Sequence, residues 1–444
     1  MITTSSNPDV NYLARVFRVE DIQKHPNADK LQLVTVEGET VVTGLDCKAG
    51  AVYVHFTVES TIDSRFLAWS NSFSDAERNH DVTKKGFFSK QGRVKIILLR
   101  GIPSNGYIIP ASELEKYIYN FYGQSVDLSK FVGKSFDSIG EDRFVKKYVR
   151  FVQPTSIPKQ KTKGKIKKFE SKLIADQFRF HESTVNFRKD LGKLDPNDEI
   201  IISDKIHGSS WIVSKVLIKK PLNWKEKVAK WFGVSVQESQ YGELYASRTV
   251  VKNSKIESDR AGFYDADIWK IVADRVYPLL TDGVSLYGEV YGFTPSGKCI
   301  QPGYDYSCPP GQLDFIVYKG TITMPNGDVY VMSQAQLESY CAPRGLKTDE
   351  VLYRGKAKDL FPDLDIHNHW HKEFLHSLEA KYLARKCQKC KNDRWAEGIC
   401  LKIQQPFVWN CLKLKCFNFL SAEGAVLDSN ELSVEEEDDA NNVS

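Results

Sequence analysis

Residues 204–210 read Asp-Lys-Ile-His-Gly-Ser-Ser and lie between two apolar, β-branched runs. Upstream is the run 199–202 (Glu-Ile-Ile-Ile), and downstream are 211–213 (Trp-Ile-Val) and 216–218 (Val-Leu-Ile). This pattern predicts a strand, a tight polar turn and a second strand. A lysine at a strand end, followed by a glycine-containing turn, is held in a fixed position, which suits a nucleophile such as Lys205.

The composition is that of a globular protein with two or three domains. The chain has 444 residues, of which 41% are hydrophobic and 27% are charged, and this length supports several hydrophobic cores. Nine cysteines without regular spacing are typical of a reduced protein, so we expect a soluble, intracellular one. No apolar run is long enough to cross a bilayer, so no membrane partner is expected.

Two charged segments divide the chain. Seven lysines lie between Lys159 and Lys172, and residues 435–439 are all acidic. The first segment predicts a linker that either contacts phosphates or is only a solvated connection, and the second predicts a disordered tail. The resulting boundaries are 1–150 for a first domain, 151–172 for the basic linker, 173–425 for a second domain and 426–444 for the tail.

Short alternating strands separated by glycine turns predict a small all-β barrel in residues 1–150. The stretches 25–31 (His-Pro-Asn-Ala-Asp-Lys-Leu) and 99–106 (Leu-Arg-Gly-Ile-Pro-Ser-Asn-Gly) resemble the tRNA-binding OB-fold module attached to some aminoacyl-tRNA synthetases. The resemblance implies an OB barrel with a face for nucleic acid. The alternative is that its polar residues pair within the barrel and bind nothing.

The second domain alternates strands with two main helices. Apolar periodicity predicts helices at 265–280 and 371–386, and an Asn326-Gly327 turn predicts a hairpin. Ser333 fits the capping box of a further helix. The predicted strands that follow the Lys205 hairpin are 241–249, 284–292, 313–318, 329–331, 396–403 and 411–416.

Residues 219–230 combine lysines with apolar side chains in the spacing of a helix. Leu222, Val228, Trp231 and Phe232 alternate with these lysines, so we expect an amphipathic helix. Such a helix either packs by its apolar side or contacts the backbone of a nucleic acid duplex. Basic amphipathic helices also bind membrane surfaces or protein targets.

Six motifs in order resemble those of the covalent nucleotidyltransferases, the superfamily of ATP-dependent RNA and DNA ligases and mRNA capping enzymes. They are Lys-Ile-His-Gly at 205–208, Ser-Arg-Thr at 247–249, Tyr-Gly-Glu-Val-Tyr-Gly at 287–292, the aromatic strand 315–318, Glu-Gly-Ile-Cys-Leu-Lys at 397–402 and Leu-Lys-Leu-Lys at 412–415. The first motif is similar to the RNA ligase 2 type, whereas DNA ligases and capping enzymes have Lys-x-Asp-Gly.

With the OB-type segment in front, the chain resembles the fifth family of RNA ligases, which seal nicks whose 3′-OH end is RNA. The fold class that this implies is α+β, in which an all-β OB barrel precedes an α+β nucleotidyltransferase domain built on antiparallel sheets.

The resemblance implies that Lys205 attacks the α-phosphorus of ATP and forms lysyl-AMP. A free lysine has a pKa of ~10.4, so the site must lower it, and nearby lysines with a divalent cation do so by charge repulsion. Glu397 and Glu289 would hold the cation, Mg²⁺ or Mn²⁺. The implied nucleotide-binding residues are Ile206, His207, Arg248, Glu289, Phe315, Tyr318, Lys402, Lys413 and Lys415.

Adenine needs an apolar or aromatic partner, and alternation places Phe315 and Tyr318 on opposite faces of their strand. The family's aromatic-then-acid pattern favours Tyr318, although Lys319 stands where an acid is usual. The choice between Phe315 and Tyr318 therefore stays open.

The function implied is an ATP-dependent RNA ligase for RNA repair, a monomer that seals 3′-OH/5′-phosphate nicks in duplexes with RNA at the 3′-OH end. One alternative is another covalent nucleotidyltransferase, a DNA ligase or a capping enzyme. The other is a non-catalytic RNA- or tRNA-binding protein, which the intact Lys205, Glu289 and Glu397 argue against.

Overall fold

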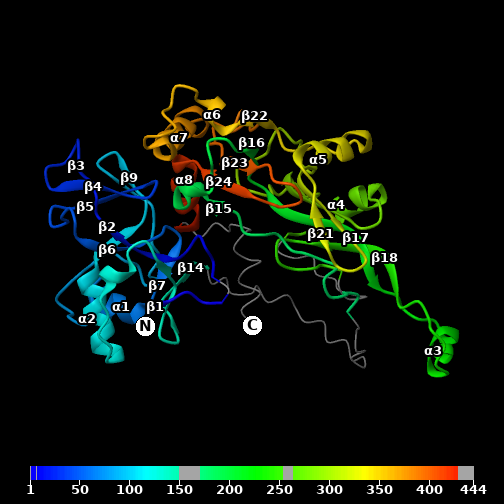
Figure 1. Ribbon diagram of the computed structural model, residues 1–444, viewed down its shortest axis with the longest axis horizontal. Helices are drawn as coiled ribbons and strands as arrows, with labels where there is room; N and C mark the ends of the chain where they lie inside the picture. Colours follow the sequence, from blue (N-terminus) through cyan, green and yellow to red (C-terminus); the bar gives the residue numbers. More distant parts are fainter. Residues whose placement is uncertain (1, 7, 150–170, 254–263, 429–444) are drawn as a thin grey trace.

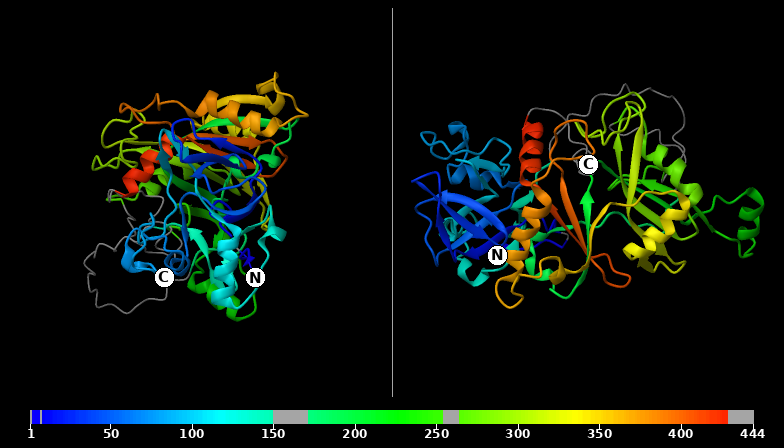
Figure 2. Two further views of the ribbon diagram at one scale, coloured as in Figure 1. Left: turned by 90° about the vertical axis from the view of Figure 1, so that its left-hand side faces the viewer. Right: turned by 90° about the horizontal axis from the view of Figure 1, so that it is seen from above.

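The computed structural model describes residues 2–6, 8–149, 171–253 and 264–428. The expected linker lies outside these ranges except for its last two residues. The expected tail lies outside them except for residues 426–428, which belong to helix α8 (Phe417–Asp428). Figures 1 and 2 show three groups of strands that follow one another along the long axis of the molecule.

The first group comprises the strands of residues 2–147. A four-stranded sheet has the order β10-β6-β2-β11, a three-stranded sheet has the order β3-β4-β5, and smaller sheets are β1-β12-β13, β14-β7 and β8-β9. The bounds are β1 Ile2–Thr3, β2 Ala14–Arg18, β3 Ile22–Lys24, β4 Leu31–Val36, β5 Glu39–Gly44, β6 Val52–Phe56, β7 Ser60–Ile62, β8 Ile97–Leu99, β9 Ile102–Ser104, β10 Tyr107–Pro110, β11 Ser135–Phe136, β12 Ser138–Ile139, β13 Asp142–Arg143 and β14 Val145–Lys147. Among the described residues, these pairings form separate antiparallel sheets, and the OB barrel stays a prediction.

The sequence pattern predicted that this part is all-β. The structure corrects this expectation, because the part also contains helices α1 (Ser64–Trp69) and α2 (Ala111–Tyr122). The side chains of Leu114, Tyr117 and Ile118 are fully buried in the core under the sheets. These positions follow the i, i+3, i+4 spacing of one helix face, and their burial stabilises α2. Gly123 ends the helix with the left-handed φ of 64° that glycine favours.

The remaining strands form two five-stranded sheets with the orders β15-β24-β23-β16-β22 and β18-β17-β19-β20-β21. All pairings are antiparallel except the parallel pair of β15 and β24. The bounds are β15 Val185–Asn186, β16 Glu199–Lys205, β17 Ser209–Lys219, β18 Ser239–Ala246, β19 Val284–Gly292, β20 Leu313–Thr323, β21 Val329–Val331, β22 Val351–Lys356, β23 Gly398–Ile403 and β24 Cys411–Lys415. The expected mixture of helices with antiparallel sheets is confirmed.

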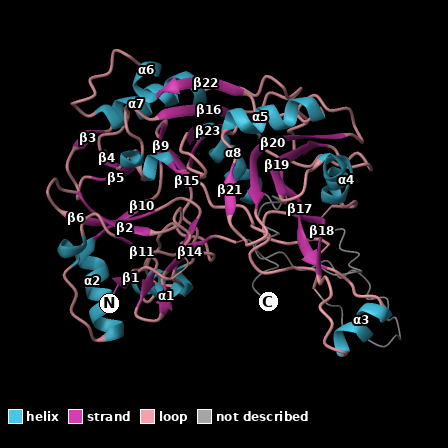
Figure 3. Ribbon diagram, turned by 45° about the vertical axis from the view of Figure 1, so that its right-hand side comes forward, coloured by secondary structure: helices cyan, strands magenta, loops and turns pink. Residues whose placement is uncertain are grey.

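The helices that accompany these sheets are seen in Figure 3. They are α3 Trp224–Trp231, α4 Ile268–Val276, α5 Gln334–Cys341, α6 Ala357–Leu360, α7 Trp370–Leu378 and α8, of which α3 alone stands away from the sheets. Helix α4 packs Val272 in one core with Trp211 of β17, and α7 packs Phe374 and Leu378 in another with Ile200 of β16. The capping box at Ser333 is present, and the predicted hairpin joins β20 to β21.

The register of the strands brings the motifs together. In the first sheet Lys205 lies opposite Gly398, and Gly398 lies opposite Lys415 on the next strand. In the second sheet Ser210 lies opposite Glu289. A Cβ atom on Gly208 would lie 2.3 Å from the carbonyl oxygen of Val290, so the turn that joins the two sheets needs glycine at this position.

Within the described ranges, the helices are all too short or too polar to cross a membrane.

Candidate active site

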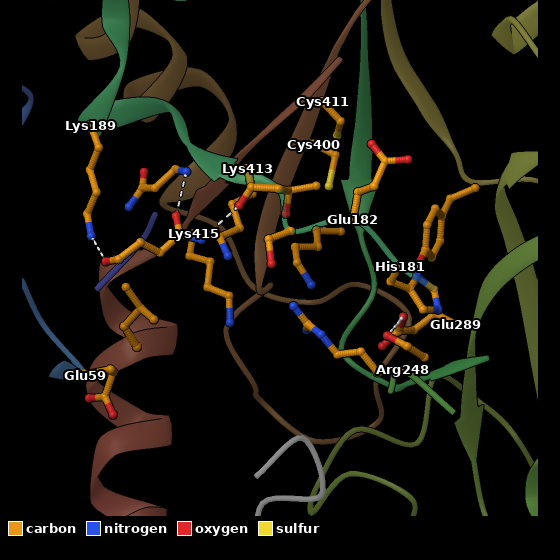
Figure 4. A pocket seen from close by; sticks show the side chains of 18 of the residues that line it. Glu59, His181, Glu182, Lys189, Arg248, Glu289, Cys400, Cys411, Lys413 and Lys415 are labelled. Carbon is orange, nitrogen blue, oxygen red and sulfur yellow. Dashed lines mark hydrogen bonds between the residues drawn. The ribbon is translucent and has the colours of Figure 1, made fainter. Parts of the chain in front are cut away.

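One pocket collects most of the predicted site residues at the junction of the two five-stranded sheets, next to the N-terminal strands. The predicted residues that line it are Lys205, Ile206, Arg248, Glu289, Tyr318, Lys402, Lys413 and Lys415. His207 and Glu397 lie behind this wall, with 7% and 1% of their surfaces exposed. Figure 4 shows lysines 413 and 415 on one side of the pocket, and Arg248 and Glu289 on the other.

A buried carboxylate lies between two lysines at the centre of the site. Lys205 Nζ is 2.8 Å from Glu397 Oε2, and Lys415 Nζ is 2.9 Å from Glu397 Oε1. The Glu397 side chain is inaccessible to solvent, whereas each lysine keeps 19% of its side chain exposed. The two ammonium groups therefore compensate the buried charge of Glu397 while remaining at the wall of the pocket.

The His207 ring is fixed between aromatic side chains. It meets the rings of Tyr304 and Phe419 edge-on, at centroid distances of 4.8 and 4.9 Å. Its Nδ1 lies 3.9 Å from Glu397 Oε2, and its backbone N–H donates to the hydroxyl of Tyr306 at 2.7 Å. Helix α8, through Phe419, thus holds the turn that follows Lys205.

The structure separates the two adenine-stacking candidates. Phe315 is buried in the hydrophobic core, where its ring meets Trp211 edge-on at 5.5 Å. Tyr318 lines the pocket, and its hydroxyl forms a hydrogen bond of 2.7 Å with Nδ1 of His181. Burial raises the pKa of Tyr318 well above its usual value, so its hydroxyl keeps the proton. Of the two aromatic rings, Tyr318 is the one placed to contact a ligand in this pocket.

Glu289 and Arg248 reach the pocket from β19 and from the segment after β18. The hydroxyl of Ser210 donates to Glu289 Oε2 at 3.3 Å, and this cross-strand contact orients a carboxylate that is 6% exposed. The side chain of Arg248 extends toward the middle of the pocket (Figure 4). Both ends of this wall thus present charged groups to a ligand.

Lys402 is more buried than its predicted phosphate contact requires. Its Nζ donates to Asp349 Oδ2 at 2.7 Å, to Gln334 Oε1 at 2.8 Å and to the carbonyl oxygen of Tyr318 at 3.0 Å. Three acceptors complete the bonding capacity of an ammonium group. The structure therefore places Lys402 beneath Tyr318, where it supports the position of this residue.

His181 and Glu182 also line the pocket, and no sequence motif predicts either of them. Burial, Arg248 and Lys319 lower the pKa of His181 from 6.5 to about 3, so its ring is neutral. Glu182 Oε1 lies 2.7 Å from Lys319 Nζ. The two residues lie in an irregular segment before β15, which has no periodic pattern that could have revealed them.

The N-terminal part contributes a further wall through the segment 9–12. Asn11 Nδ2 donates to the carbonyl oxygen of Thr184 at 3.1 Å, and Asn11 Oδ1 accepts the backbone N–H of Asn186 at 3.0 Å. Lys189 donates to the carbonyl oxygen of Asn11 and lies 5.9 Å from the centre of the Tyr12 ring. These contacts fix the N-terminal part beside the pocket, which Tyr12 and Asn11 line.

The carboxylates of the pocket fit a cation that keeps most of its water ligands. The described residues contain no group of three or more histidines, cysteines or acidic residues arranged to hold a metal ion. Mg²⁺ needs only one or two carboxylates when phosphates and waters complete its shell. Glu289 lines the pocket, where such an ion with a bound nucleotide could reach it, whereas both carboxylate oxygens of Glu397 face lysine ammonium groups.

Comparisons with known proteins agree with this geometry. Residues 198–417 match the model of the RNA ligase family. No curated protein sequence matches the chain.

Solved structures with the same fold include several point mutants of an RNA ligase from Naegleria gruberi. One mutant without ligand has a TM-score of 0.55 and 14% identity over 94% of this chain and 99% of that one. A second mutant, with ATP and Mn, has a TM-score of 0.54 and 14% identity, and the match covers 94% of this chain and 99% of that one. A third, with AMP and Mn, also has a TM-score of 0.54 and 14% identity, and the match covers 92% of this chain and 98% of that one. By the family match, residues 198–417 are an RNA ligase domain, and the protein is an RNA ligase enzyme.

Proposed function

We propose that the protein is an ATP-dependent RNA ligase that repairs RNA by sealing 3′-OH/5′-phosphate nicks in duplexes with RNA at the 3′-OH end. The observation that carries the proposal is the position of Lys205. Its amine stands at the wall of a pocket, at the end of β16, against a buried glutamate and beside Lys413 and Lys415. A fixed amine among groups that neutralise phosphate is what covalent nucleotidyl transfer needs.

In the first step the deprotonated amine of Lys205 attacks the α-phosphorus of ATP. The new P–N bond forms as the bond to the β-phosphate oxygen breaks, and pyrophosphate leaves. Lys413 and Lys415 neutralise the charge that grows on the α-phosphate. Tyr318 packs against adenine, which is supported by its place in the pocket.

In the second step AMP passes from Lys205 to the 5′-phosphate of the nick, and in the third the 3′-OH attacks that phosphate and AMP leaves. Arg248 holds the 5′-phosphate end, while His207 assists these transfers. Glu289 and Glu397 would hold Mg²⁺ or Mn²⁺, which when bound neutralises phosphate charge. The Naegleria structures with ATP or AMP and Mn support this choice of nucleotide and metal.

We also propose the domain plan 1–150, 151–172, 173–425 and 426–444, in which an N-terminal OB fold positions the nicked duplex and the protein works as a monomer. Its support is the wall that Asn11 and Tyr12 add to the pocket. Recognition of this kind depends on duplex shape and phosphates, so no base needs to be read.

The test is covalent labelling with ATP carrying a labelled α-phosphate. We expect an acid-labile, base-stable adduct, since the bond is a phosphoramidate, and Lys205→Ala should abolish it. Lys215→Ala is the matched control, because Lys215 pairs with Asp282 outside the pocket and should label normally. Absence of an adduct on the wild-type chain would refute the mechanism.

The substrate is tested by sealing nicked duplexes in which each strand is RNA or DNA in turn. We expect sealing only where the 3′-OH strand is RNA, and labelling by ATP rather than GTP. Equal sealing of a DNA 3′-OH would identify a DNA ligase activity, and labelling by GTP a capping activity.

A further inference from the structure

Helix α3 lies at the tip of a projection between β17 and β18. It stands at the opposite end of the molecule from the N-terminal strands (Figures 1 and 3). None of its residues is buried, so the expectation that it packs by its apolar side is wrong. A capping box between Asn223 and Glu226 closes its first turn, so local contacts stabilise its start.

An apolar stripe runs along the exposed surface of α3. Trp224, Val228, Trp231 and Phe232 follow the i, i+4, i+7, i+8 spacing of one helix face. Trp224 is 71% exposed, Trp231 81% and Phe232 71%. Side chains this large and apolar are seldom left to solvent together without a binding role.

Lysines flank the stripe on both sides. Lys225 and Lys227 are exposed beside it, and the Lys225 ammonium lies 5.7 Å from the centre of the Trp224 ring. Lys230 pairs with Glu238 at 2.6 Å and Lys220 with Glu226 at 2.5 Å. These lysines outnumber the acids that pair with them, so the helix offers aromatic faces together with positive charge.

We propose that α3 binds unpaired nucleotides of the RNA substrate outside the ligation site, an inference that rests on the proposed function. Aromatic side chains stack on unpaired bases while lysines contact phosphates, and this chain carries an RNA ligase domain. Trp224 and Trp231 provide the stacking surfaces, and Lys225 and Lys227 provide the charges.

A duplex backbone alone would use the lysines and leave the tryptophans in water. A membrane surface fits less well, because one helix of two turns buries too little apolar area and stable attachment takes a second signal. The position of α3 far from the pocket means that it contacts the flank of a substrate rather than its reacting ends.

The test compares two RNA probes bound to the full chain without ATP, followed by fluorescence anisotropy. One is a blunt nicked duplex, and the other is the same duplex with a single-stranded RNA extension of about ten nucleotides, roughly one binding site for such proteins. We expect Trp224→Ser/Trp231→Ser to weaken binding of the extended probe by at least about tenfold and to leave the blunt probe unchanged.

Lys225→Gln/Lys227→Gln should weaken the extended probe too, and it should flatten the dependence of affinity on salt. Tyr119→Ser/Phe121→Ser is the matched control, because these are exposed aromatic residues on α2. Adenylylation should proceed normally in all three variants. Its absence from the wild-type chain would refute the proposed function, whereas the binding measurement does not depend on it.

Equal affinity of the wild-type and tryptophan variants for the extended probe would overturn the proposal. So would a loss of binding to phosphatidylserine-containing vesicles in the tryptophan variant while RNA binding stays unchanged, because α3 would then be a membrane contact.

Discussion

The buried ion pair under Tyr318 allows a quantitative test of how the pocket is held together. Lys402 Nζ and Asp349 Oδ2 lie 2.7 Å apart, and their side chains are only 5% and 3% exposed. Asp349→Asn removes the anion and leaves the Lys402 ammonium buried with only the neutral acceptors Gln334 and Tyr318. Removal of one partner from such a pair costs about 3–5 kcal/mol, so we expect the free energy of unfolding to fall by that amount.

The assay is urea unfolding followed by tryptophan fluorescence. Asp349→Leu/Lys402→Met removes both charges, and we expect it to recover most of the loss, because an apolar pair of similar volume replaces a buried ion pair at little cost. Lys347→Met is the control, since Lys347 pairs with Asp314 at an exposed site where side chains are 65% and 35% accessible. An exposed pair contributes at most about 1 kcal/mol.

A loss below about 1 kcal/mol for Asp349→Asn would refute the reasoning, because it would mean that Lys402 keeps its hydration. The Asp349→Leu/Lys402→Met variant separates structure from chemistry. If it keeps its stability and fails to form the adduct, Lys402 contacts a phosphate directly, as the family resemblance implies.

Three more outcomes follow from the pocket. Tyr318→Ala should raise the KM for ATP by at least about tenfold. Phe315→Ala should leave the KM unchanged and lower the free energy of unfolding by about 3 kcal/mol in urea titrations. The reverse pattern would assign the stacking ring to Phe315. Because the folded pKa of His181 is lowered from 6.5 to about 3, its stabilising contribution is present above pH 6.5 and lost as pH falls toward 3. The wild type should lose about 2 kcal/mol more than His181→Gln between pH 6.5 and roughly 4.5, and parallel pH profiles in urea unfolding would contradict this. Glu397→Gln should slow adduct formation by at least about a hundredfold at saturating Mg²⁺, with normal rates in a quench-flow assay as the contrary result.

The sequence of strands along the chain and the residues at their ends were predictable because local patterns determine them, whereas the order of strands within each sheet was not. Alternation located β16, β17 and β19. The motif that each strand carries then indicated which of its side chains to expect in the site. The same alternation separated Phe315 from Tyr318. It did not say which of the two faced the pocket, because that depends on the side of the sheet against which α4 packs.

The rest of the site is set by contacts between distant segments. His181 and Glu182 come from irregular chain, and only the folded structure brings them to Tyr318 and Lys319. The N-terminal wall depends on Asn11, whose bonds to residues 184 and 186 span more than 170 positions of sequence. In α2, the helical spacing of Leu114, Tyr117 and Ile118 lies between short strands, and the β pattern of those neighbours leads to the expectation of an all-β part.

The central glutamate joins these two kinds of information. Its motif predicts a metal ligand, yet the fold gives each of its oxygens an ammonium partner, Lys205 on one side and Lys415 on the other. A carboxylate so close to an amine favours the charged amine, which is the form that cannot attack a phosphate. The Glu397 contact must therefore loosen before Lys205 becomes a nucleophile. In the proposed mechanism, an ion that shares Glu397 would weaken this contact, and the same residue would then link metal binding to activation of the lysine, a connection that the spacing of the motifs alone does not contain.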